Sequence, residues 1–105
     1  MKLKFGTYEF EGPYQSAREM YEKPGVYLVL CRDIKEVGKF YVLDVQESDK
    51  VRTHAATSPN MVCWTKGCHG VGVLAVAVSY MERSTKEDRA KVVKYMRSIY
   101  DVPCK

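Results

Sequence analysis

Three apolar segments dominate the hydrophobic pattern of this chain. Residues 25–31 (GVYLVLC), 39–45 (KFYVLDV) and 71–80 (VGVLAVAVSY) are nearly continuous apolar runs rich in β-branched and aromatic residues, which is typical of strands. Since polar residues do not alternate along them, the pattern predicts a sheet covered on both faces. The polar link at 32–38 is short, so the first two strands are predicted to pair antiparallel.

The N-terminal residues follow a different pattern. Apolar positions alternate around Gly6 in KLKFGTYEFEG (2–12), which predicts a short hairpin. The following segment, PYQSAREMYEK (13–23), is expected to hold a short helix or a turn that ends at Pro24-Gly25.

Two helices are predicted to cover the sheet. The first is expected to begin near Ser48 or Asp49 and to end before Ser58-Pro59, because a residue before proline resists helical geometry. The second is predicted from a capping box at Ser84 and Glu87, followed by an apolar stripe with helical spacing made of Ala90, Val92, Val93, Met96, Ile99 and Tyr100.

The predicted element order is therefore strand, strand, helix, strand, helix. It indicates an α+β fold with a small three-stranded, largely antiparallel sheet flanked by helices and an N-terminal hairpin extension. With 105 residues, the chain is predicted to form one domain over 1–105, because two halves would each be too small to hold a core.

Composition and charge exclude few classes of function. The chain is 46% hydrophobic and 29% charged, with a formal net charge of +4, which permits an anionic partner without requiring one. The apolar runs are too short for a membrane span or a signal peptide, and the four cysteines lack the dense spacing of a disulfide framework. We therefore expect a cytoplasmic protein that does not interact with membranes.

The cysteines also raise the question of a metal site. Cys63, Cys68 and His69 lie close in sequence, but a fourth zinc ligand is not evident, and an adjacent Cys-His pair lacks a third group to orient the imidazole for nucleophilic catalysis. We predict no metal here and interpret the segment as a polar loop in which Cys63 is buried beside Trp64.

Several short motifs occur in a recognisable order. They are Gly25-Val26-Tyr27 after Pro24, DVQES at 44–48, Val51, Trp64, and, in the last predicted helix and after it, Arg89, Tyr100, Pro103 and Cys104. In order and spacing they resemble small bacterial and phage domains of the GIY-YIG nuclease superfamily. A second register, with Tyr41-Val42-Leu43 as the second motif, recovers a tyrosine but loses the matches at 47–48 and Trp64.

The resemblance implies a site in which two tyrosines, an arginine and a glutamate surround one divalent metal ion. Here Gln46 occupies the glycine position of the second motif, His54 the arginine position, Ser58 the histidine position and Val93 the glutamate position. Tyr27 alone is retained, and an isopropyl group cannot ligate a hard cation. We therefore predict a non-catalytic domain without a cofactor, with Tyr27 and His54 as remnants of the site.

The remaining candidate function is binding of DNA or RNA. The resemblance implies that the first helix faces nucleic acid, and Lys50, Arg52 and His54 on it, with Lys66 in the following loop, are predicted to contact phosphates. Two alternatives stay open. One is a protein-interaction module whose cleft or hairpin binds a partner chain. The other is a divergent endonuclease that uses Mg²⁺ or Mn²⁺, with His54 replacing the arginine.

Overall fold

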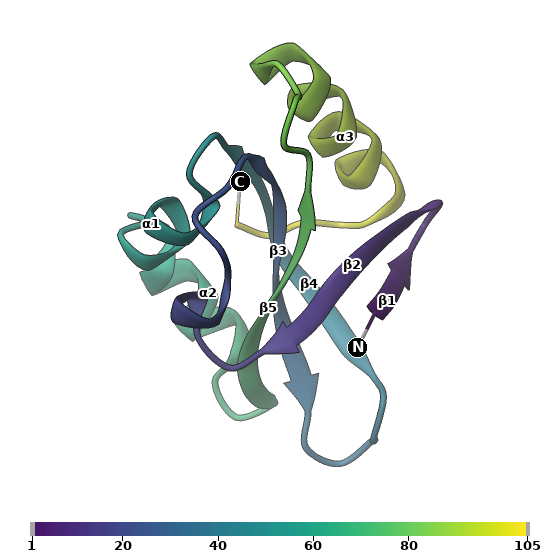
Figure 1. Cartoon of the computed structure of the whole chain (residues 1–105). Coiled ribbons are helices and arrows are strands. Elements are labelled where there is room, and N and C mark those ends of the chain that lie inside the picture. The colour runs from purple at the N-terminus through teal and green to yellow at the C-terminus, as the bar shows by residue number, and fades with distance from the viewer. Residues whose placement is uncertain (1, 105) are drawn as a thin grey trace.

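The computed structural model describes residues 2–104, and within them five strands form one antiparallel sheet (Figure 1). The order across the sheet is β1-β2-β5-β3-β4. The strands are β1 (Lys2–Phe5), β2 (Tyr8–Tyr14), β3 (Gly25–Asp33), β4 (Phe40–Ser48) and β5 (Gly72–Tyr80).

The α+β class is confirmed, but the predicted three-stranded sheet is wrong. The three predicted strands form its centre, as β4, β3 and β5, and the N-terminal hairpin adds two more strands because β2 pairs with β5 through Glu11↔Val78 and Tyr14↔Val76. The alternation around Gly6 indicates that one face of the hairpin is buried, yet it carries no information about which strand the hairpin joins.

Helices cover the two faces of the sheet unequally (Figure 1). The long helix α3 (Lys86–Ile99) packs on one face, where Phe5, Phe10 and Met96 belong to the same core cluster. The short helices α1 (Val51–Ala56) and α2 (Met61–Cys68) cover the other face together with a 3₁₀ turn, η1 (Ala17–Glu19).

The helix α2 lies where a polar loop was predicted. Its buried residues, Trp64 and Cys68, are four positions apart and so lie on one side of the helix. Most of its other side chains are exposed, so the segment shows only a narrow apolar stripe. The expectation of a helix ending before Ser58-Pro59 is confirmed by α1, which ends at Ala56, but the helix begins at Val51 and Ser48 still belongs to β4.

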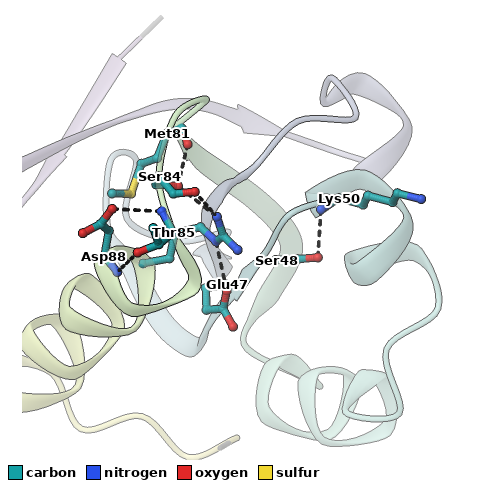
Figure 2. Close-up of polar contacts among 8 residues, drawn as sticks. Glu47, Ser48, Lys50, Met81, Ser84, Thr85 and Asp88 are labelled. Carbon is teal, nitrogen blue, oxygen red and sulfur yellow. Dashed lines mark hydrogen bonds and ion pairs between the residues drawn. The ribbon is translucent and has the colours of Figure 1, made fainter.

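The predicted capping box of α3 is displaced by one residue. Thr85, not Ser84, is the N-cap, and Asp88, not Glu87, completes the box (Figure 2). The Thr85 hydroxyl accepts a hydrogen bond from the Asp88 N–H at 3.1 Å, and the Asp88 carboxylate accepts one from the Thr85 N–H at 2.9 Å. The hydrogen bond from the Thr85 N–H, with a further contribution from the Thr85 side chain, lowers the pKa of the Asp88 carboxyl group. The predicted apolar stripe is confirmed at Val92, Val93 and Met96, which are buried, but Ala90 and Ile99 are exposed.

The cysteines form two disulfides, so the expectation that they lack a disulfide framework is wrong. Cys31 on β3 is bonded to Cys68 at the end of α2, and Cys63 in α2 is bonded to Cys104 near the C-terminus. Cysteine pairing depends on spatial proximity, and these partners are 37 and 41 residues apart in sequence. Because all four sulfurs are bonded, zinc ligation and thiolate chemistry by these cysteines are excluded in this structure.

The five-stranded sheet makes Phe10 a central core residue, since its ring is fully buried. We expect Phe10→Ala to lower the free energy of unfolding by about 3–5 kcal/mol, as for other large-to-small core substitutions. The neighbouring Glu9→Ala should change it by less than about 0.5 kcal/mol because Glu9 is exposed. Urea denaturation of both variants measures this. A nearly neutral Phe10→Ala would show that the hairpin is a peripheral extension.

Candidate nucleic-acid interface

The predicted basic residues of the first helix are exposed. In α1 the apolar residues Val51 and Ala55 point into the core, four positions apart, so the intervening residues face solvent. Arg52, His54 and the preceding Lys50 are all exposed. The ion pairs among residues 2–104 include neither Lys50 nor Arg52. The two side chains are thus accessible to an anionic partner.

Two contacts fix the start of α1. The Ser48 hydroxyl accepts a hydrogen bond from the Lys50 N–H at 3.0 Å, and Figure 2 shows the Lys50 side chain extending away from this contact. Glu22, from the segment before β3, accepts hydrogen bonds from the Thr53 N–H and hydroxyl. These bonds to Thr53, with a smaller contribution from the charge of Arg52, lower the pKa of Glu22. Glu22 therefore orders the helix and offsets part of its positive charge.

The structure brings together the two predicted remnants of the nuclease site. The hydroxyl oxygen of Tyr27 lies 2.8 Å from Nδ1 of His54, and the two rings meet edge to face with centroids 5.7 Å apart. Tyr27 is fully buried, so its own hydroxyl does not reach the protein surface. His54 is exposed and connects this buried hydroxyl to the protein surface.

The Tyr27 hydroxyl serves to orient His54. Burial, and secondarily the negative charge of Asp44, raise the pKa of Tyr27, so the phenol stays protonated at neutral pH and can donate a hydrogen bond to Nδ1 of His54 in the tautomer that leaves this nitrogen unprotonated. The proton of that imidazole then lies on Nε2. The exposed edge of His54 can thus donate a hydrogen bond to a phosphate oxygen, whereas Tyr27 cannot supply a phenolate.

A buried carboxylate lies close to this pair, and sequence reasoning missed its role. Asp44 is fully buried and accepts four hydrogen bonds, from the Val45 N–H (2.8 Å), Gln46 Nε2 (3.0 Å), Asn60 Nδ2 (3.0 Å) and Trp64 Nε1 (2.8 Å). The sequence signal was an acidic residue within an apolar strand run. Because four donors occupy its oxygens, Asp44 is a structural anchor rather than a metal ligand.

Val93, which occupies the glutamate position in the GIY-YIG resemblance, does not lie on the same face of the sheet as Tyr27. Val93 belongs to the core cluster on the α3 face, whereas Tyr27 belongs to the cluster on the α1 and α2 face. Val93 lines a groove of about 520 Å³ between β4 and α3, with Glu47, Lys94 and Arg97 among its other lining residues. The Arg97 guanidinium donates to the Val45 carbonyl at 2.8 Å. The predicted catalytic positions therefore do not converge on one cavity.

The single carboxylate in that groove is already paired. Glu47 accepts a hydrogen bond from Nε of the buried Arg89 at 3.0 Å, and Arg89 also donates to the Ser84 carbonyl and hydroxyl. Figure 2 shows Glu47 below Ser84 and Thr85 in this cluster. Arg89 thus joins the end of β4 to the start of α3, and this structural role accounts for an arginine at the beginning of the helix.

The remaining predicted site residues are dispersed. Lys66 is exposed on α2 and lines a different cavity, with Cys63, Gly67 and Pro103 among its neighbours there. Tyr41, the tyrosine of the second register, pairs with Cys31 near the far end of β3 from Tyr27. Within residues 2–104, no group of three or more His, Cys, Asp or Glu side chains is arranged to hold a metal ion.

Comparison of the chain with protein-family models, with curated proteins and with solved structures gives no match.

The buried phenol of Tyr27 generates a prediction about pH. The pKa of Tyr27 is higher in the folded protein than in the unfolded chain. The stability that this difference contributes is therefore fully present below about pH 10, where both states are protonated, and it is lost as the pH rises further. We expect Tyr27→Phe to cost about 1 kcal/mol at pH 7 through the lost hydrogen bond, and this difference from the wild type should shrink between pH 9 and pH 11. Urea denaturation across that range measures both quantities.

Tyr14 and Tyr80 also have raised pKa values, so some loss of stability at high pH should remain in the variant. Parallel pH dependences for wild type and Tyr27→Phe would contradict the prediction.

Proposed function

We propose that this protein is a non-catalytic, GIY-YIG-like domain that binds DNA or RNA through the exposed cations of α1. The observation that carries the proposal is the accessibility of Lys50 and Arg52 next to His54, whose imidazole is oriented by the buried Tyr27. Lysine and arginine side chains that contact phosphates position a protein on nucleic acid without reading its base sequence.

Charge reversal tests the proposed interface. The double variant Lys50→Glu, Arg52→Glu should weaken binding to any oligonucleotide at least tenfold at low salt. If each side chain contacts one phosphate, the slope of log K against log salt concentration should fall by about two. Fluorescence anisotropy with labelled DNA and RNA over a series of salt concentrations measures both effects.

The matched control is Lys86→Glu, Lys91→Glu. It makes the same change in net charge at exposed positions of α3, and it should retain most of the wild-type affinity. Equal weakening by both double variants would indicate attraction by net charge alone and would refute an interface at α1. Failure of the wild-type protein to bind either nucleic acid would refute the proposal and favour the alternative, a protein-interaction module.

A second assay addresses catalysis. We expect no cleavage of supercoiled plasmid or structured RNA in the presence of Mg²⁺ or Mn²⁺, because the glutamate position is the apolar Val93 and the carboxylates of Asp44 and Glu47 are already engaged. Cleavage that persists through purification and is lost in Tyr27→Phe would instead support the divergent endonuclease.

A cytoplasmic location remains a prediction, and the two disulfides weigh against it. Thiol-reducing systems keep most cytosolic cysteines reduced, whereas disulfides persist in oxidising compartments. Within residues 2–104, no helix is both long and apolar enough to cross a bilayer.

A further inference from the structure

An apolar cavity of about 320 Å³ lies on the α1 and α2 face of the sheet, apart from the basic side chains of α1. Its floor is formed by strand residues, among them Val29 and Val76, and Trp64 of α2 and Ala55 of α1 line it as well. These four residues are almost completely buried. The segment after β2, which includes η1, packs beside α1 and supplies further lining residues (Figure 1).

The mouth of this cavity is polar and carries one available cation. Gln15, Ser16 and Arg18 line it, and the ion pairs among residues 2–104 do not include Arg18. The nearby carboxylate of Glu19 accepts hydrogen bonds from the N–H groups of Gln15 and Ser16 at 2.8 and 3.2 Å, so it is held within the cap of η1. The charge of Arg18 is therefore free to meet a ligand.

We propose that this cavity binds a small apolar carboxylate, with the hydrocarbon part against Trp64 and the carboxylate at Arg18. The volume is at the lower end of the range of about 300–1,000 Å³ for small-molecule sites, and an apolar interior with a few polar groups at the mouth is their usual composition. A guanidinium pairs with a carboxylate in a planar, two-bond geometry. One cation at the mouth matches a monovalent anion better than a phosphate dianion.

Trp64 provides a direct reporter, since it is the single tryptophan of the chain and lines the cavity. The wild-type protein is titrated with phenylacetate and, separately, with the neutral isostere phenylacetamide while tryptophan emission is recorded. We expect saturable binding of phenylacetate at least tenfold tighter than that of phenylacetamide. In Arg18→Gln, phenylacetate should bind about tenfold more weakly and phenylacetamide as it does to the wild type.

A second pair of variants tests the location. Ala56 lines the cavity and is exposed, so Ala56→Leu should fill the cavity without disturbing the core and should abolish the response. The control Ala90→Leu places the same side chain at an exposed position of α3 and should leave the titration unchanged. Circular dichroism establishes that both variants remain folded.

The outcomes are distinct. The absence of a saturable response to phenylacetate, equal affinity for the acid and the amide, or unaltered binding by Ala56→Leu would each overturn the proposal. None of these results depends on whether α1 binds nucleic acid, because the titrations contain no oligonucleotide.

Discussion

The buried carboxylate of Asp44 is the constraint on which one side of this structure depends. A charged group without solvent is costly unless donors surround it, and removal of one donor leaves a buried carboxylate oxygen without its hydrogen bond. Two of its four donors come from its own strand, β4. The other two are Asn60, which immediately precedes α2, and Trp64 within α2. Satisfying this single side chain therefore requires α2 to lie against β4 in one orientation.

The disulfides reinforce the same arrangement. Cys68 ties the end of α2 to β3, and Cys63 ties the middle of α2 to the C-terminal segment. The Leu43 carbonyl of β4 then accepts a hydrogen bond from the Cys104 N–H at 2.9 Å, which covers part of the sheet edge. A short helix with only two buried residues would be marginal alone, so these attachments account for its stability and for the shape of the cavity beside it.

The two faces of the sheet have different consequences for function. On the α3 face, the buried Arg89 and its partner Glu47 make the groove beside Val93 a structural junction. On the opposite face, Tyr27 and His54 form a linked pair that reaches the surface beside the exposed cations of α1. A site that supports metal chemistry needs its carboxylate and tyrosine on one cavity. Their separation here supports a proposal of binding without cleavage.

The sequence by itself determined the three central strands, the long amphipathic helix and the position of α1, because each is encoded by local periodicity or by a local break such as Ser58-Pro59. It also indicated that Val93 is a core residue. Only the tertiary structure decided that β2 joins β5, that the cysteines pair, that Asp44 anchors α2 and that Tyr27 meets His54. These features depend on contacts between residues far apart in sequence. A hydrophobic pattern records which side of a segment is buried, but it does not record what lies against it.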